Sequence, residues 1–112
     1  MATFELYTDK ADQFRFRSKA GNGEIILASQ GYTVKESAMN GIESVKTNAA
    51  DDVNYDRKET EAGHSFNLLA ANKLVIGSSQ VYTTASSRDN GIESVKKNAS
   101  EANVQEIIVR DL

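Results

Sequence analysis

The sequence contains no cysteine and a single histidine, and these scarcities exclude several kinds of chemistry. Without cysteine the chain can form no disulfide, thiolate zinc site, iron–sulfur cluster or cysteine nucleophile. A single histidine argues against a histidine-based metal centre. We therefore expect neither a metal ion nor a cofactor.

Long apolar runs and an excess of basic charge are also missing. No stretch approaches the ~18 consecutive apolar residues that a membrane span needs. Met1–Glu5 lacks a basic and apolar leader, from which we expect a cytoplasmic protein. The 13 Lys+Arg and 16 Asp+Glu give a net charge of −3, which argues against binding of double-stranded DNA. The 112 residues, 39% hydrophobic and 26% charged, fit one globular domain.

What the sequence does contain is an internal duplication. Residues Asn40–Lys46 read Asn-Gly-Ile-Glu-Ser-Val-Lys, and the same residues recur at Asn90–Lys96, an offset of 50 positions. Between 14–49 and 64–99, 18 of 36 positions are identical. The chain is therefore predicted to consist of two copies of one supersecondary unit, a first copy at about 1–53 and a second copy at about 54–112.

Each copy is predicted to hold three strands and one helix. Alternation of polar and apolar residues places the strands at Phe4–Thr8, Phe14–Lys19 and about Glu24–Ser29, and near Asn54–Glu59, His64–Leu69 and Leu74–Ser79. Gly21-Asn22-Gly23 predicts a type I′ hairpin turn, and Asn72-Lys73 carries the corresponding turn. A final strand is expected at Val104–Leu112, whose apolar run Ile107-Ile108-Val109 suits a covered or central position.

The helices follow the third strand of each copy. Thr33 and Glu36 have the spacing of a capping box, and Asn48 is expected to end this helix in the left-handed conformation. The second helix is expected from Thr83 or Thr84 to Asn98. The apolar faces are predicted to consist of Ala38, Ile42, Val45 and Ala49 in the first copy and Ala85, Ile92, Val95 and Ala99 in the second.

The repeated motif is interpreted as structural. Its characteristic residues are Asn40, Gly41, Ile42 and Val45, with Asn90, Gly91, Ile92 and Val95. A glycine in mid-helix costs about 1 kcal/mol relative to alanine. Gly41 and Gly91 are therefore expected to bring the helix backbone close to a packed neighbour, with functional flexibility as the alternative.

The two copies are expected to form one two-layer α+β domain. A unit of ~50 residues buries too little apolar surface to be secure alone. The chain also passes directly from the first helix into the segment near 53–59, which must then serve as the last strand of the first copy and the first strand of the second. We expect a monomer with an internal pseudo-two-fold.

The two copies also resemble a known family. The residues that carry the resemblance are Asn22-Gly23-Glu24, Ile26, Ser29, Tyr32, Asn40–Lys46 and Asn48-Ala49, then Tyr55, Arg57-Lys58, Phe66-Asn67-Leu68, Ala70-Ala71-Asn72, Val75-Ile76, Ser78-Ser79, Tyr82 and Asn90–Ala99. Over nearly its whole length the chain resembles the YegP-like family of small bacterial proteins of unknown function. The resemblance implies tandem β-β-β-α-β units that form a single antiparallel sheet, with C-terminal strands exchanged between the units. It implies no activity, substrate or cofactor. The second copy departs from the pattern at Leu74, where the first copy has Glu24.

One asymmetric feature is a candidate binding surface. If Phe14 and Phe16 face the helices, then Arg15, Arg17 and Lys19 face outward together with Tyr7 and Glu5 on the neighbouring strand. We call Tyr7, Arg15, Arg17 and Lys19 the basic strip. Basic and aromatic sheet faces can bind single-stranded RNA, although a solvated face is the simpler interpretation. Replacement of the three basic residues by serine is expected to change stability by only about 0.5 kcal/mol or less.

Other polar residues are given structural interpretations. His64 replaces Phe14 and is expected to pack or fill a turn rather than act as an acid or base. Ser29, Ser79, Tyr32 and Tyr82 recur without a visible activating base, so capping or cross-strand bonding is expected of them. Asp51-Asp52 is expected to be a solvated loop, and Glu43/Lys46 and Glu93/Lys97 are expected to be surface ion pairs.

The function predicted from these observations is a non-catalytic binding or structural module that uses its open sheet face. Two alternatives remain. The first is a small enzyme with a site at the seam between the copies, where Ser29/Ser79 or Tyr32/Tyr82 hydroxyls would converge. The second is a weak binder of single-stranded nucleic acid through the basic strip. An enzyme would need a concave site with convergent polar groups.

Overall fold

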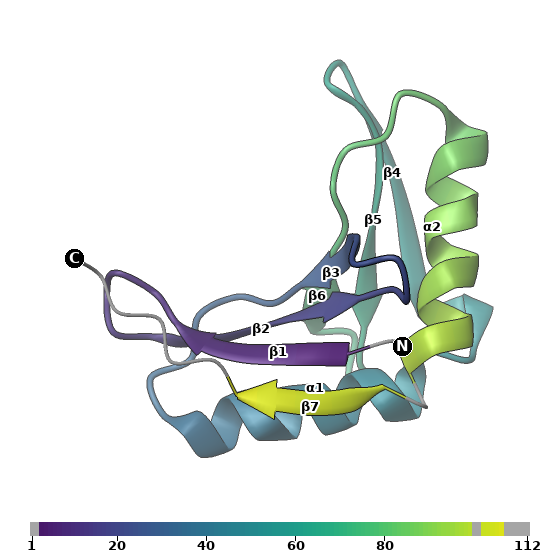
Figure 1. Ribbon diagram of the computed structural model, residues 1–112. Coiled ribbons are helices and arrows are strands. Elements are labelled where there is room, and N and C mark those ends of the chain that lie inside the picture. Colours follow the sequence, from purple (N-terminus) through teal and green to yellow (C-terminus); the bar gives the residue numbers. More distant parts are fainter. Residues whose placement is uncertain (1–2, 100–101, 107–112) are drawn as a thin grey trace.

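A computed structural model describes residues 3–99 and 102–106, and Figure 1 shows the arrangement of their elements. The elements in chain order are β1 (Thr3–Thr8), β2 (Phe14–Lys19), β3 (Ile25–Ala28), α1 (Lys35–Asn48), the 3-10 turn η1 (Asp52–Asn54), β4 (Tyr55–Thr60), β5 (Gly63–Leu69), β6 (Val75–Ser78), α2 (Ala85–Asn98) and β7 (Asn103–Glu106). The six strands predicted before the second helix are confirmed, with ends that agree to within about one residue. The end of the last predicted strand, including Ile107-Ile108-Val109, lies outside the described residues.

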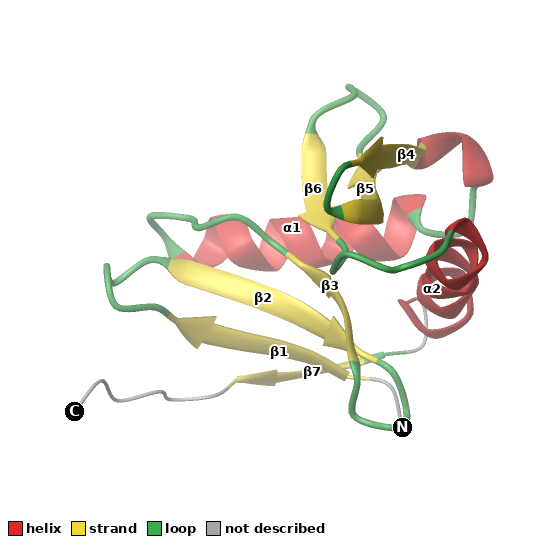
Figure 2. Cartoon of the chain, turned by 90° about the horizontal axis from the view of Figure 1, so that it is seen from above, coloured by secondary structure: helices red, strands yellow, loops and turns green. Residues whose placement is uncertain are grey.

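The strands form one seven-stranded sheet in the order β4-β5-β6-β3-β2-β1-β7. Both helices lie on one face of this sheet (Figures 1 and 2). The strand that follows α1 pairs with β5 of the second copy, and the strand that follows α2 pairs with β1 of the first. The exchange of C-terminal strands implied by the family resemblance is thus confirmed. That the copies form a single unit of folding, joined near residues 53–59, stays a prediction.

The expectation of a purely antiparallel sheet is wrong in one pairing. β7 runs parallel to β1, with Phe4 opposite Val104, whereas the other pairings are antiparallel. Strands joined by a tight hairpin must run antiparallel, but a strand that returns after a helix can pair in either direction. The long path through α2 gives β7 that freedom.

The core is continuous between the two copies. Apolar residues of both sheet halves and both helices form a single cluster that includes Phe4, Phe16, Phe66 and Leu68. α1 packs on β2 but also on β5 and β6, while α2 packs on β5 and also on β3. Each helix therefore covers strands of both copies. No helix among the described residues is long and apolar enough to cross a membrane.

The helix faces agree with the sequence, with one exception. Ile42 and Ile92 are 1% and 0% exposed, and Val45 and Val95 are fully buried. In the second helix, however, the buried counterpart of Ala38 is Arg88, and Ala85 is only partly buried. The apolar face was inferred from residue type, and for that reason the prediction did not include a buried arginine at this position.

The helical glycines lie against tyrosine side chains. A Cβ at Gly91 would lie 2.5 Å from the Tyr82 hydroxyl oxygen, and one at Gly41 would lie 2.8 Å from that of Tyr32. Contacts that short are not tolerated without movement, so the packing interpretation of both glycines is supported over functional flexibility.

The β2–β3 turn differs from the type I′ prediction. Type I′ requires positive φ at two residues, but in this turn only Gly23 has it, at +85°. The bonds Gly23 N–H to Ala20 O and Ala20 N–H to Glu24 O, both 2.9 Å, enclose a three-residue loop. This is the alternative hairpin in which a left-handed residue follows a type I turn. Lys73 occupies the same position in the second copy, at φ +71°.

Two predicted helix ends are also wrong. The N-cap of α1 is Val34, which has no side-chain oxygen, and Thr33 lies one residue too early to form the capping box. In α2 the N-cap is Thr84, whose hydroxyl accepts from Ser87 N–H at 3.0 Å. Asn48 is the last residue of α1 and does not have the positive φ of a left-handed cap, and Ala49 after it keeps right-handed helical geometry at φ −65°. The Asn48 side-chain amide donates back to Ser44 O at 2.8 Å.

Candidate binding surfaces

The basic strip lies on the sheet face that the helices leave open. In β1 and β2 the buried residues Phe4, Leu6 and Phe16 alternate with the strip residues. Tyr7 lies opposite Arg15 in the register, and Arg17 lies opposite Glu5. The four residues chosen from the sequence are therefore neighbours in space, whereas their role in binding stays a prediction.

The charges of the strip are largely paired. Arg17 Nε donates to Glu5 Oε1 at 2.6 Å, and Lys19 Nζ lies 3.1 Å from Glu5 Oε2. Arg15 Nε donates to Asp9 Oδ2 at 2.5 Å. Three positive charges thus face two negative ones, so the strip is less basic than the sequence indicated.

Glu5 is a fixed anion beneath the strip. Its side chain is 11% exposed, and this burial by itself would raise the carboxyl pKa. The hydrogen bonds and charges of Arg17 and Lys19 outweigh the burial and hold the pKa of Glu5 below its ordinary value. Arg17 also lies over the ring of Tyr7, 4.7 Å from its centroid. Glu5 and Tyr7 together fix the guanidinium in one place.

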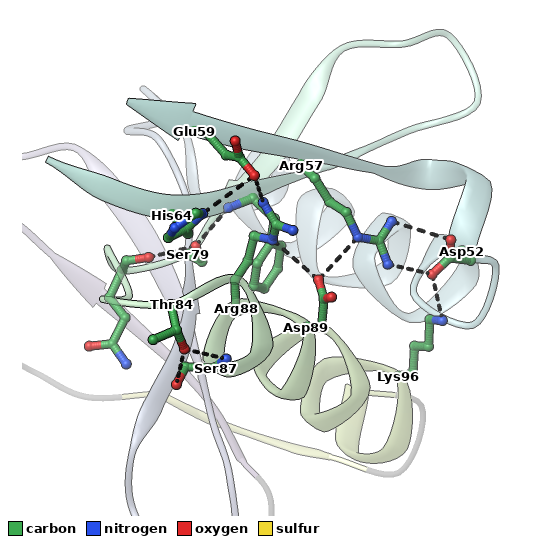
Figure 3. Close-up of polar contacts among 12 residues, drawn as sticks. Asp52, Arg57, Glu59, His64, Ser79, Thr84, Ser87, Arg88, Asp89 and Lys96 are labelled. Atoms are coloured by element: carbon green, nitrogen blue, oxygen red, sulfur yellow. Dashed lines mark hydrogen bonds and ion pairs between the residues drawn. The ribbon is translucent and has the colours of Figure 1, made fainter. Parts of the chain in front are cut away.

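The second-copy half of the open face is neutral. Asp56 and Lys58 pair with each other at 3.3 Å, and Ser78 Oγ donates to Asn67 Oδ1 at 2.8 Å. Charge is concentrated instead on the helix side of the second copy, where Figure 3 shows a chain of ion pairs. We call this the second-copy ion-pair network, and its members are Asp52, Arg57, Glu59, Arg88, Asp89 and Lys96.

The second-copy ion-pair network ties α2 to the start of β4. Asp52 accepts from Arg57 at 3.0 Å and from Lys96 at 2.8 Å. Because these cations stabilise its charged form, the pKa of Asp52 is lowered to about 2. Arg57 and the buried Arg88 both approach Asp89 Oδ1 at 3.2 Å. Lys96 also pairs with Glu93, which was expected to pair with Lys97.

His64 lies at one end of this network. Its Nδ1 is enclosed, has no hydrogen bond within the described residues, and lies 3.6 Å from Glu59 Oε1. The backbone of His64 forms a bridge with Tyr82, as that of Phe14 does with Tyr32. The two residues therefore have the same place in the fold, which agrees with a packing role for His64.

The repeated serines are committed to the backbone. Ser29 Oγ accepts from Phe16 N–H at 2.9 Å and donates to Gln30 O at 2.8 Å. Ser79 makes the same two contacts, with Phe66 and Gln80. The cross-strand interpretation of these hydroxyls is thus supported. In the described part of the chain, no group of three or more acidic or histidine side chains is placed to hold a metal ion.

A groove at the seam between the copies was not predicted. It consists of two adjoining cavities of about 220 and 470 Å³. The smaller is lined by Glu24, Ile26, Tyr82, Ser87, Asn90, Gly91 and Ser94, and the larger by Ala20, Gly21, Asn22, Asn90, Glu93, Ser94, Lys97 and Asn98. One wall is the β2–β3 turn of the first copy and the other is α2 of the second, which lie side by side (Figure 1). In the sequence, the one sign of this groove was that the repeated motif contains polar residues, which the core does not require.

Comparisons with known proteins agree with the fold. The family model described as a domain of unknown function (DUF1508) matches residues 9–56 and 61–106. The solution structure of a UPF0339 protein from Shewanella oneidensis is 44% identical, with a TM-score of 0.90 over 96% of this chain and 92% of that one. The solution structure of yegP from Escherichia coli, a protein of unknown function, is 47% identical, with a TM-score of 0.92 over 98% and 96% of the two chains.

A sequence relative gives the same assignment. The chain is 58% identical over 69 residues to a UPF0339 protein of Stutzerimonas stutzeri, described as lying in the 5′ region of the ptx operon. That alignment spans 61% of this chain and 62% of the relative. The names of these relatives assign no function. The two matched repeats and the shared structure show that the chain belongs to the DUF1508 family of proteins of unknown function, the family of the YegP-like proteins.

Proposed function

We propose that the protein is a non-catalytic binding module that presents the basic strip to an acidic protein segment. The observation that carries this proposal is the fixed position of the Arg17 guanidinium. Within the described residues only its Nε has a hydrogen-bond partner. The terminal amino groups keep their donors, which match the oxygens of a partner carboxylate in a forked arrangement.

The non-catalytic part of the proposal is supported by the use of the repeated hydroxyls. A serine nucleophile needs a base that accepts its proton. Ser29 and Ser79 instead donate their hydroxyl hydrogen bonds to the backbone carbonyl groups of the following residues. In both copies, the serine that was considered for an enzyme site at the seam therefore has a structural role.

An acidic protein segment fits the strip better than single-stranded nucleic acid does. Sheet platforms for RNA stack two or three bases on exposed aromatic rings. The strip has one ring, that of Tyr7, and Arg17 already covers a face of it. Carboxylates need only the free donors of Arg15 and Arg17, which the paired arrangement leaves available.

Binding of a fluorescent oligoglutamate peptide to the full chain tests the proposal. We expect affinity that weakens with salt and falls by roughly tenfold in Arg17→Ser. The matched control is Lys58→Ser, on the neutral half of the same face, which should bind as the wild type does. Equal affinity of Arg17→Ser and wild type would contradict the proposal. Tighter binding of a single-stranded oligonucleotide would favour the nucleic-acid alternative.

A further inference from the structure

The seam groove has polar groups that the fold does not use. The Asn90 amide, the Tyr82 hydroxyl and the Lys97 ammonium have no hydrogen-bond or ion-pair partner among the described residues. Ser94 Oγ accepts from Asn98 Nδ2 at 3.2 Å, but its own O–H group donates to no acceptor among the described residues. These groups contrast with Ser29 and Ser79, whose hydroxyls both donate and accept. Convergent unpartnered groups in a concavity are what a ligand site requires.

Asn90 is the residue that the fold explains least. In the repeated motif Gly91 is needed beside Tyr82, and Ile92 and Val95 are buried in the core. Asn90 is exposed, yet it lines both cavities and so lies between them. Its carboxamide can donate and accept hydrogen bonds at once, as a peptide group does.

The two charges of the groove that have no ion-pair partner among the described residues, Glu24 and Lys97, lie in different cavities. Glu24 lines the smaller cavity, and its carboxylate accepts one long hydrogen bond, from Gln80 Nε2 at 3.5 Å. Lys97 and Glu93 both line the larger cavity. The Glu93 carboxylate is already paired with Lys96 at 3.1 Å, so Lys97 carries the unpaired charge there. A carboxylate can hold an ammonium group and an ammonium a carboxylate, and Asn90 lies where the two cavities meet.

From this arrangement we propose that the seam groove binds a short zwitterionic peptide. Its amino terminus would lie at Glu24, its carboxylate at Lys97, and a peptide group at Asn90. This site is separate from the basic strip and does not depend on the function proposed for it. It also requires both copies, because the first supplies Glu24 and the second supplies Asn90 and Lys97.

The duplication supplies matched variants. At the positions that correspond to Glu24 and Lys97, the other copy has Leu74 and Thr47. Glu24→Leu and Lys97→Thr therefore introduce residues that the same local fold already accepts. Asn40→Ala is the control for Asn90→Ala, because Asn40 belongs to the same motif on α1 and lies outside the groove.

The test is an NMR titration of the full chain with triglycine, and with triglycine blocked at both ends by acetyl and amide groups. We expect saturable shifts of amide signals in residues 20–26 and 87–98. Blocking the peptide ends should weaken binding by roughly tenfold. The same loss of affinity is expected in each of the variants Glu24→Leu, Lys97→Thr and Asn90→Ala, whereas Asn40→Ala should bind as the wild type does.

Several results would overturn the proposal. The absence of saturable shifts in the groove would show that the groove is not a peptide site. Equal affinity for the blocked and the unblocked peptide would show that the charged ends of the peptide are not recognised. An equal loss of affinity in Asn40→Ala and Asn90→Ala would show that the effect does not come from this side of the seam. Spectra with the native dispersion in every variant show that a lost shift reports on binding and not on unfolding.

Discussion

The two copies place different chemistry on the same backbone. Where the first copy has Phe14 and Ala38, the second has His64 and Arg88, and the strands and helices around them keep their places. The apolar pair needs no partner, whereas Arg88 is buried and bonded to Asp89 at 3.2 Å. The shared fold therefore depends on the positions that did not diverge, the core residues and glycines of the repeated motif. The diverged positions are where the copies can differ in what they contact.

At another position it is the first copy that has the buried polar residue and the second that has the apolar one. Ser18 of the first copy corresponds to Leu68 of the second, and both are fully buried. The Ser18 hydroxyl has no hydrogen-bond partner among the described residues, while Leu68 packs in the core. A buried unpaired hydroxyl costs free energy, so neither copy is the better packed at every position.

Truncation of the shared core should affect both copies by similar amounts. Ile92→Ala and Ile42→Ala each remove a buried side chain from the one continuous core. We expect a loss of about 2–5 kcal/mol in the free energy of unfolding for each, measured by urea denaturation. A loss below about 0.5 kcal/mol in one variant alone would mean that the two helix faces are not equivalent.

Removal of the basic strip should destabilise the folded chain through an interaction that only the first copy's half of the sheet contains. The sequence alone predicted almost no effect for replacement of Arg15, Arg17 and Lys19 by serine. Because Glu5 is mostly buried beneath Arg17 and Lys19, its carboxylate would lose its partners, and we now expect a loss of about 1–3 kcal/mol. Adding Glu5→Gln removes the stranded charge and should restore part of the stability. No loss in the urea midpoint of the serine variant would show that Glu5 is solvated.

The hairpin turns offer a smaller test of the same comparison. Gly23 and Lys73 occupy the same left-handed position, which costs a residue with a side chain about 1 kcal/mol or slightly more. Lys73→Gly should therefore raise the free energy of unfolding by up to about 1 kcal/mol, while Gly23→Ala should lower it. Urea midpoints measure both. An unchanged midpoint in Lys73→Gly would mean that the turn relaxes without strain.

The smallest effect is expected from the ion pair that joins Asp52 to the second helix and has no counterpart at the first helix among the described residues. Asp52 is bonded to Lys96, whereas Lys46, the counterpart of Lys96, lies near the ring of Phe4. The pKa of Asp52 is lowered from 3.8 to about 2 in the folded state. Its contribution is therefore present above about pH 4 and lost as the pH falls toward about 2. Asp52→Asn should be slightly less stable than wild type at neutral pH, with a gap that closes over this window. A gap independent of pH would contradict the assignment.

The sequence predicted the elements well for a definite reason. Strand alternation and the repeated motif appear twice, so each copy supported the interpretation of the other. Comparison of the copies failed where they differ. The buried position of Arg88, for example, was expected to hold an apolar residue because its counterpart is Ala38. It also failed for features that depend on three dimensions. The parallel placement of β7 follows from the path of the chain, and the seam groove arises only when the β2–β3 turn meets α2.

The two copies share a single core, and we predict that they unfold together. Urea unfolding of the intact chain, followed by amide signals of β2 and of β5, tests it most directly. We expect the two sets of signals to disappear at the same urea concentration, and Ile92→Ala to lower both midpoints equally. Unfolding of β5 at a lower urea concentration than β2, with β2 retaining its native signals, would contradict it.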